Sequence, residues 1–139
     1  PEIKDYMNST INACRKTGYV KNIFGRKIHL KGINDKNFSI RSFQERAAIN
    51  APIQGSAADI IRLAMIKINK AIKDEKKLKA KMLLQIHDEL IFETLENDAE
   101  YSKKIIKELM TSVSKSEHHM FSIPLEVNVN SGYNWGEAH

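Results

Sequence analysis

Near the start of the chain, apolar residues recur at helical spacing, at Ile3, Tyr6, Met7, Ile11 and Cys14. This periodicity predicts a helix over residues 1–17, and a glycine directly after it, Gly18, is typical of a helix end. Two short apolar segments follow over residues 19–21 and 27–30, and Gly25 lies in the loop between them. This arrangement predicts a β-hairpin.

The next part of the chain predicts two helices separated by a proline. Residues 31–37 are polar and predict an exposed loop, after which Ser39 is expected to cap a helix that runs to about Asn50. A second helix is predicted from Pro52 to roughly Asp74, because proline lacks the amide hydrogen that a helix interior needs. One apolar stripe follows this second helix, at Ile53, Ala57, Ile60, Ile61, Ala64, Met65, Ile68 and Ile72.

The rest of the chain predicts short strands and one more helix. The elements are strands over residues 82–86 and 90–93, a helix over about 98–116 and a last strand over 125–129. Asn97 and Glu100 have the spacing of a capping box at the start of the helix, and Lys115 suits the dipole at its end. No internal repeat or low-complexity segment is present.

The composition is ordinary for a soluble globular domain or a large piece of one: 139 residues, 42% hydrophobic and 28% charged. No window approaches the roughly 18 unbroken apolar residues of a membrane span, and no signal-peptide pattern is present. We therefore expect a cytoplasmic protein with no membrane partner. The chain begins at Pro1, inside a predicted helix and without an initiator methionine, which indicates a truncated N-terminus.

Charge and cysteine content limit the kind of partner and the kinds of metal site and disulfide that the chain can have. Lysine and arginine number 22 against 17 acidic residues, a formal net charge of +5. This balance fits a polyanionic partner such as nucleic acid, although many other cytosolic proteins are equally basic. Cys14 is the only cysteine, which excludes an internal disulfide and a multi-cysteine metal site. We expect Cys14 to be a small, buried and inert residue on its helix.

The turn between the two central strands departs from the usual chemistry of tight hairpins. Such turns normally contain glycine because they need positive backbone φ angles, whereas His87, Asp88 and Glu89 occupy this one. Aspartate tolerates the left-handed region better than most residues, so Asp88 makes the turn possible. A carboxylate at a rigid hairpin tip is well placed to bind Mg²⁺, which prefers oxygen ligands. Alternatively, the three residues are solvated polar groups at an exposed turn.

A polar row is formed by Arg46, Asn50 and Gln54, which are spaced four residues apart and would share one face of a continuous helix. We expect Pro52 to interrupt that helix. Arginine matches the geometry of phosphate, while asparagine and glutamine bond sugars and base edges. Two other interpretations remain open. The small residues nearby can serve tight helix packing, and Arg46 can be an ordinary partner of Glu45 or another acid.

A set of short segments carries the most specific information in the sequence. In chain order they are residues 17–20 (TGYV), 25–27 (GRK), 45–59 (ERAAINAPIQGSAAD), 85–93 (QIHDELIFE), 124–127 (PLEV), Gly132, Trp135 and the final Ala138-His139. Together, in this order and spacing, they closely resemble the C-terminal part of the family A DNA polymerases, of the bacterial DNA polymerase I type. The resemblance covers essentially the whole chain and implies that the natural C-terminus is present. Ile53 and Ser56 depart from the family at positions that vary within it.

This resemblance implies a role for each candidate site residue. The hairpin turn resembles the third polymerase motif, whose aspartate is one of two that hold the catalytic magnesium ions, so Asp88 is implied to be a metal ligand. Glu89 is implied to be a neighbouring catalytic acid with a less essential role, and His87 to lie near the primer terminus. The family residues that contact the template-primer DNA are matched by Arg46, Asn50 and Gln54.

The resemblance also implies an α+β fold in which helices pack on a small antiparallel sheet, with residues 1–50 at the end of the fingers and 51–139 in the palm. The parent would be a DNA-directed DNA polymerase that acts in replication and repair and extends a primer 3′ end with two Mg²⁺ ions. The other metal aspartate, and the fingers helix that grips the deoxynucleoside triphosphate, belong to earlier motifs that these 139 residues lack. We therefore expect this chain to need the rest of the polymerase chain and to be inactive alone.

Two other functions compete with this one. The first is a non-catalytic nucleic-acid-binding module that grips duplex DNA through Arg46, Lys21 and Lys27, and tight duplex binding by this chain alone would favour it. The second is a stand-alone metal nuclease, which needs more acidic residues near Asp88 than the sequence provides.

Overall fold

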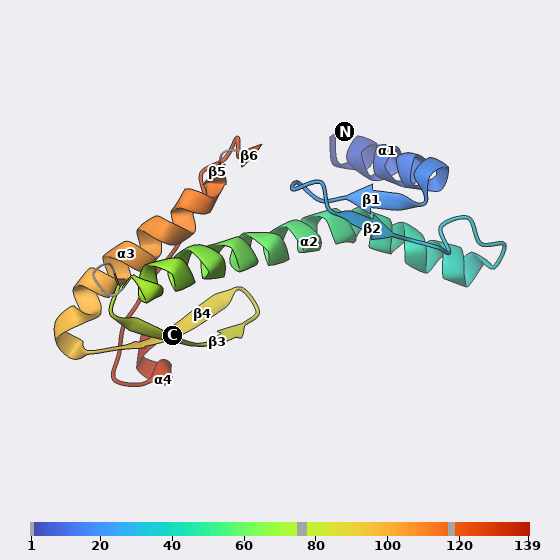
Figure 1. The fold of residues 1–139 in the computed structure, drawn as a ribbon. Helices are drawn as coiled ribbons and strands as arrows, with labels where there is room; N and C mark the ends of the chain where they lie inside the picture. Colours follow the sequence, from blue (N-terminus) through green and yellow to red (C-terminus); the bar gives the residue numbers. More distant parts are fainter. Residues whose placement is uncertain (1, 75–77, 117–118) are drawn as a thin grey trace. The chain divides into compact units, whose positions relative to one another are not determined.

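The computed structural model describes residues 2–74, 78–116 and 119–139 of the chain. It combines helices with short antiparallel strand pairs and divides into two compact units, Pro1–Asp59 and Ile60–His139 (Figure 1). This mixture confirms the α+β fold class predicted from the sequence. The long helix α2 (Phe38–Lys73) contributes residues to both units.

In the first unit, helix α1 (Glu2–Thr17) leads into a small hairpin, as the sequence predicted for the described residues. Gly18 ends the helix with a φ of 77°, and its N–H donates to the carbonyl of Cys14 at 2.7 Å. Strands β1 (Tyr19–Lys21) and β2 (Lys27–His29) pair antiparallel, and Gly25 lies in their loop with a φ of 79°. Glycine is favoured at both positions because a Cβ makes a positive φ costly.

The core of the first unit joins α1 and the β1–β2 hairpin to α2. Its buried members are Cys14, Val20, Leu30, Ile33 and Ala48. Cys14 has no exposed surface, and burial raises the pKa of its thiol. The prediction that Cys14 is a small buried residue on a helix is confirmed.

Helix α2 is continuous from Phe38 to Lys73, so two predictions about this region were wrong. Pro52 lies inside one helix and does not separate two. Ser39 does not cap the helix either. The side-chain oxygen of Asn37 accepts the N–H of Ser39 at 2.9 Å, so Asn37 caps a helix that begins two residues earlier than predicted.

Two side-chain hydroxyl groups bond backbone carbonyls of α2 close to Pro52. The proline ring removes the N–H that would bond the carbonyl of the residue four positions earlier, and it disturbs that turn. The hydroxyl of Tyr6 donates to the carbonyl of Ile49 in this turn at 3.3 Å. The hydroxyl of Ser56 donates to the carbonyl of Pro52 itself at 2.5 Å. Neither carbonyl is that of Ala48, which loses its donor to the proline, and a serine hydroxyl bonded four residues back tends to bend a helix.

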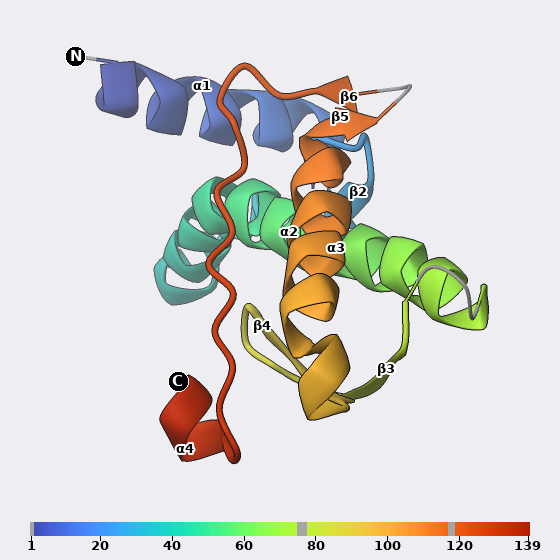
Figure 2. The same ribbon diagram turned by 90° about the vertical axis from the view of Figure 1, so that its left-hand side faces the viewer.

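In the second unit, a hairpin and helix α3 pack with the end of α2 (Figures 1 and 2). Strands β3 (Ala80–Ile86) and β4 (Glu89–Thr94) pair antiparallel, which confirms both predicted strands, and α3 covers Ala99–Thr111. The shared core contains Ile68 and Ala71 from α2, Leu78 and, from α3, Ile106. Apolar hairpin side chains, among them Met82, Leu90 and Phe92, pack against this core.

The third helix begins within one residue of its predicted start, but its predicted cap and its predicted end were wrong. Asn97 lies inside the 3₁₀ turn η1 (Glu96–Asp98) and not in front of a helix, so it cannot act as the predicted cap. Asp98 precedes α3 and makes no side-chain cap hydrogen bond. The helix ends at Thr111, and the 3₁₀ turn η2 (Ser112–Ser114) follows it. Lys115 then begins strand β5 (Lys115–Ser116), which pairs with β6 (His119–Met120).

The segment over residues 125–129 was predicted to be a strand, but it pairs with no strand in the described parts of the chain. Its burial still alternates, with Leu125, Val127 and Val129 partly buried and the residues between them exposed. A strand needs a second backbone beside it, and alternation alone does not supply one. The short helix α4 (Trp135–Ala138) follows near the C-terminus.

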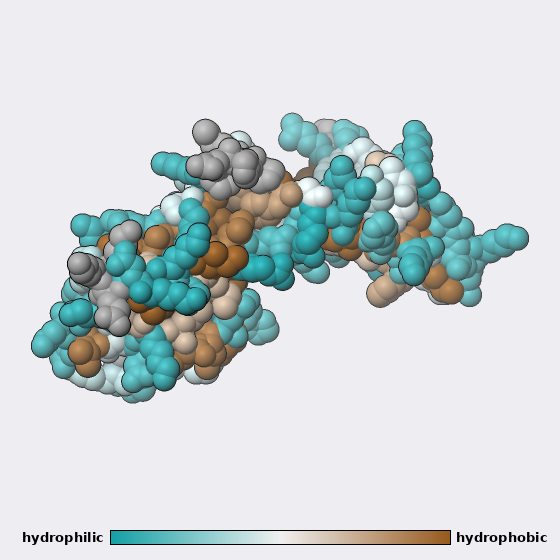
Figure 3. Space-filling view, in the orientation of Figure 1, coloured by the Kyte–Doolittle hydropathy of each residue, from teal (hydrophilic) through white to brown (hydrophobic). Residues whose placement is uncertain are grey.

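Apolar side chains remain at the surface of both units, seen as brown areas in Figure 3. Examples are Phe38 and Phe43 in the first unit and Leu95 in the second. None of the described helices is both long enough and apolar enough to cross a membrane.

Candidate functional site

The tip of the β3–β4 hairpin carries the residues that were predicted to perform the chemistry. Ile86 pairs with Glu89, so His87 and Asp88 form a two-residue turn and Glu89 already belongs to β4. The residue with a positive φ, 51°, is His87 and not Asp88, which corrects the expectation that aspartate would take this conformation. The Gln85 side chain donates to the carbonyl of His87 at 3.1 Å and so supports the turn.

A β-bulge lies in the same hairpin, close to the tip. Met82 pairs with Phe92 and Leu84 pairs with Ile91, so Leu83 has no residue opposite it. A bulge increases the local twist and changes the direction of the side chains that follow it. The bulge at Leu83 therefore helps to set the orientation of the tip.

The two carboxylates of the tip have different surroundings. Asp88 is exposed, and its carboxylate has no hydrogen bond or ion pair to the described residues. Glu89 is partly buried, and its Oε1 lies 3.3 Å from Nδ1 of His139. The ring of His139 meets the ring of Trp135 edge-on, with 6.3 Å between the ring centres. The sequence analysis matched His139 to the family but assigned it no role.

The hairpin tip carries one exposed carboxylate of a kind that Mg²⁺ accepts as a ligand. Across residues 2–74, 78–116 and 119–139 there is no group of three or more Asp, Glu, His or Cys side chains that could hold a metal ion. Mg²⁺ commonly takes one or two carboxylates from a protein, together with water and substrate phosphate. The exposed carboxylate of Asp88 fits this requirement as one ligand.

The polar row lies on α2 in the first unit. Arg46, Asn50 and Gln54 are all exposed, and because the helix continues through Pro52 their spacing places them in one row. Nη1 of Arg46 donates to the hydroxyl of Ser42 at 2.9 Å. The row and the hairpin tip belong to different units of the structure.

Glu45 does not use Arg46 as its partner, although the two are adjacent. Its Oε1 lies 2.5 Å from Nη2 of Arg15 and 3.9 Å from Nε of Arg41. The interpretation of Arg46 as the partner of Glu45 is therefore wrong.

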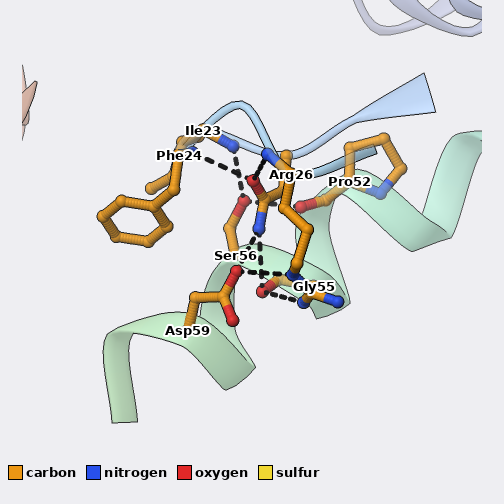
Figure 4. A network of polar contacts seen from close by, with 8 residues as sticks. Ile23, Phe24, Arg26, Pro52, Gly55, Ser56 and Asp59 are labelled. Carbon is orange, nitrogen blue, oxygen red and sulfur yellow. Dashed lines mark hydrogen bonds and ion pairs between the residues drawn. The ribbon is translucent and has the colours of Figure 1, made fainter. Parts of the chain in front are cut away.

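A polar network that the sequence analysis missed holds the β1–β2 loop against α2 (Figure 4). Oδ2 of Asp59 accepts from Nδ2 of Asn22 at 2.5 Å and from Nε of Arg26 at 2.8 Å. The side-chain oxygen of Asn22 in turn accepts the N–H of Arg26 at 2.9 Å. The hydroxyl of Ser56 accepts the N–H of Ile23 at 3.1 Å. Loop and helix are thus joined by both side chains and backbone.

This network stabilises the part of α2 that contains Gln54. The carbonyl of Gly55 accepts from Nη2 of Arg26 at 3.2 Å and from Nδ2 of Asn22 at 3.3 Å. Asp59 is only 8% exposed, and a buried carboxylate needs such donors to offset its loss of water. Arg26 and Asp59 both lie in segments that match the family, but their pairing spans 33 positions and no local spacing reveals it.

Comparisons with known proteins match nearly the whole chain, and all of them point to the same family. The family model described as DNA polymerase family A matches residues 1–137. DNA polymerase I of Rhizobium leguminosarum is 48% identical over 140 residues, which cover 100% of this chain and 14% of the relative. DNA polymerase I of Streptococcus pneumoniae serotype 4 is 44% identical over 138 residues, which cover 99% of this chain and 15% of the relative.

A solved structure is similar as well. The POL domain of Pol1 from M. smegmatis, in complex with DNA primer-template and dNTP, matches with a TM-score of 0.88 and 41% sequence identity. The match covers 97% of this chain and 23% of that chain. The chain thus spans only a small part of the proteins that it resembles.

Proposed function

This chain belongs to DNA polymerase family A, and from that premise we propose that it is a C-terminal part of a DNA-directed DNA polymerase. Such an enzyme binds template-primer DNA and adds deoxynucleotides from triphosphates to the primer 3′ end, in the replication and repair of DNA in the cytoplasm. The strongest support is the match over the full chain, including a TM-score of 0.88 to a polymerase domain in complex with primer-template and dNTP.

We assign residues 1–50 to the end of the fingers and residues 51–139 to part of the palm. Under this assignment the fingers part contains Arg46 and Asn50, and the palm part contains the β3–β4 hairpin. The boundary then falls within the continuous helix α2.

Asp88 is the proposed magnesium ligand, and Glu89 the neighbouring acid of lesser importance. The two Mg²⁺ ions of the intact enzyme would stabilise negative charge on the reacting phosphate and on the groups that attack and leave it. The carboxylate of Asp88 is exposed and has no partner among the described residues, so no existing contact opposes its binding to a cation. Glu89 already contacts His139, which fits its lesser role. The remaining ligands would come from the rest of the polymerase chain.

The proposed contacts to template-primer DNA are Arg46, Asn50 and Gln54, while His87 would lie near the primer terminus. A guanidinium has five N–H donors, and Arg46 uses one of them on Ser42, which leaves others for a phosphate. Asn50 and Gln54 offer donors and acceptors suited to sugars and base edges. A site on a regular helix holds such groups more rigidly than a loop does.

Primer extension by the intact polymerase tests this proposal. Asp88→Ala should abolish incorporation and leave duplex binding largely unchanged, because the lost carboxylate acts on the metal and the transition state and not on DNA. Glu89→Ala should reduce incorporation less. Near-normal turnover by Asp88→Ala would show that the tip is an ordinary polar turn.

A non-catalytic nucleic-acid-binding module is the alternative, and the exposure of Lys21 and Lys27 on the β1–β2 hairpin favours it. This alternative predicts tight duplex binding by the 139-residue chain alone. A DNA-binding measurement on that chain separates the two functions.

A further inference from the structure

The C-terminal residues 132–139, which we name the C-terminal strap, contact both ends of strand β4. The hydroxyl of Tyr133 donates to Oε1 of Glu96, shortly after the end of β4, at 3.0 Å. Nδ1 of His139 lies 3.3 Å from Oε1 of Glu89, the first residue of β4. The second contact is adjacent in sequence to the proposed metal ligand Asp88.

The C-terminal strap is ordered by its own hydrogen bonds. The side-chain oxygen of Asn134 accepts the N–H of Glu137 at 3.1 Å, and Oε2 of Glu137 accepts the N–H of Tyr133 at 3.0 Å. These reciprocal bonds resemble a capping box and start helix α4. The edge-on contact with Trp135 then fixes the ring of His139 from a second side. His139 therefore has two side-chain contacts, one with Trp135 and one with Glu89.

We propose that His139 is a positioning residue for the polymerase reaction. It holds the carboxylate of Glu89 toward the C-terminal strap, and so leaves Asp88 as the carboxylate of the tip that meets the metal. This inference rests on the proposed function of the hairpin tip. Without His139, the Glu89 carboxylate is free to turn toward the tip, where it binds the cation together with Asp88 and moves the metal from the position that Asp88 alone would set.

The exposure of the pair sets the size of the expected effect. The side chains of His139 and Glu89 are 67% and 43% exposed, so water competes for the contact between them. Exposed pairs of this kind change equilibria by about two- to fivefold. An effect in this range is measurable in single-turnover incorporation and in metal binding.

The test uses the intact polymerase that contains this chain and two readouts: single-turnover incorporation, and Mn²⁺ binding followed by electron paramagnetic resonance in the presence of primer-template. His139→Leu should lower the rate by about two- to fivefold and strengthen Mn²⁺ binding by a similar factor, because the released Glu89 carboxylate becomes a second ligand, with primer-template affinity unchanged. His139→Gln keeps an N–H donor and should restore most of both values. In a Glu89→Ala background, His139→Leu should add no further change, because the partner of the contact is already absent.

Two glycines of the C-terminal strap provide a matched pair of backbone variants. A Cβ on Gly132 would lie 2.6 Å from Cβ of Glu137 and 2.9 Å from the backbone nitrogen of Ala138, so Gly132→Ala must displace the strap. A Cβ on Gly136 would come no closer than 3.4 Å to the side-chain oxygen of Asn134. Gly132→Ala should therefore reproduce both effects of His139→Leu, and Gly136→Ala should behave as the parent does.

Measuring Asp88→Ala in the same two assays separates failure of this inference from failure of the proposed function. If Asp88→Ala is inactive but His139→Leu has the parent's rate and Mn²⁺ affinity, His139 has no positioning role and the proposed function stands. Equal effects of His139→Leu and His139→Gln, or full additivity with Glu89→Ala, would also overturn that role. If Asp88→Ala keeps near-normal turnover, the proposed function of the tip fails and the role of His139 fails with it.

Discussion

The polar row on α2 gives a quantitative prediction for DNA binding by the intact polymerase. Arg46 is exposed, and its one contact described above is a hydrogen bond to a neutral hydroxyl. If Arg46 meets a phosphate, Arg46→Ala removes one phosphate contact and flattens the slope of log affinity against log salt by about 0.9. Over a fourfold rise in salt, from about 50 to about 200 mM, the variant should therefore lose about 3.5-fold less affinity than the parent.

The assay is a salt titration of duplex binding, paired with single-turnover incorporation. Arg41 is a matched control on the same helix, because its guanidinium already donates to the carbonyl of Asp35 at 2.9 Å and lies 3.9 Å from Glu45. Arg41→Ala should leave the slope unchanged. Gln54→Ala removes no charge, so it should also keep the slope. Its incorporation rate should fall by up to about a hundredfold, because small misplacements of reacting atoms are costly.

Three results would count against this reasoning. Equal slopes for the parent and Arg46→Ala, with normal incorporation by Gln54→Ala, would show that the row is structural. A change in slope at Arg41→Ala as large as that at Arg46→Ala would indicate a general effect of charge. Weaker binding by Arg46→Ala at every salt concentration, with an unchanged slope, would indicate loss of helix packing.

Other residues and the isolated chain give further tests. The 139-residue chain alone should not extend a primer above an Asp88→Ala control, because one carboxylate cannot hold two metal ions. Asp59→Ala should lower the free energy of unfolding by about 2–3 kcal/mol in denaturant titrations, because two side-chain donors lose their shared acceptor. Burial raises the pKa of Cys14, so less thiolate forms at mildly alkaline pH, and iodoacetamide should label the folded protein more slowly than the unfolded chain.

Local patterns in the sequence were sufficient for elements whose signals lie within a few residues. Helical spacing followed by Gly18 located α1 and its end, and the loop glycine Gly25 located the first hairpin. Apolar runs on both sides of the polar turn located β3 and β4. In each case the residues that form the element also carry its boundary signal.

Predictions failed where the deciding partner lies far away in the sequence. Close to Pro52, the Tyr6 hydroxyl bonds the carbonyl of Ile49, a contact over 43 positions that no local pattern predicts. The contact of His139 with Glu89, between the end of the chain and the hairpin tip, follows from no local rule. Residues 125–129 have the alternation of a strand but no pairing partner among the described strands. An alternating pattern alone does not distinguish a paired strand from an extended segment without a partner.

Local rules are broken at three positions, and all of them lie in or beside segments that match the polymerase family. His87 takes a positive φ, Leu83 forms a bulge, and Pro52 occupies a helix interior. The positive φ of His87 and the proline in the helix interior each have a cost on the order of 1–3 kcal/mol. Such costs are usually retained where the geometry serves a function. Pro52 allows the cleanest test of this view, because it belongs to neither the polar row nor the hairpin tip.

Pro52→Ala should make the polymerase more stable and less active. Alanine restores the missing N–H and removes the ring clash, which is worth about 3 kcal/mol, and the gain is offset by roughly 1 kcal/mol because the unfolded chain becomes more flexible. We expect a net stabilisation of about 2 kcal/mol. A regular helix also changes the position of Gln54 relative to Arg46, because Pro52 lies between them, so single-turnover incorporation should fall. Higher stability with an unchanged rate would show that the proline has no part in the geometry of the row.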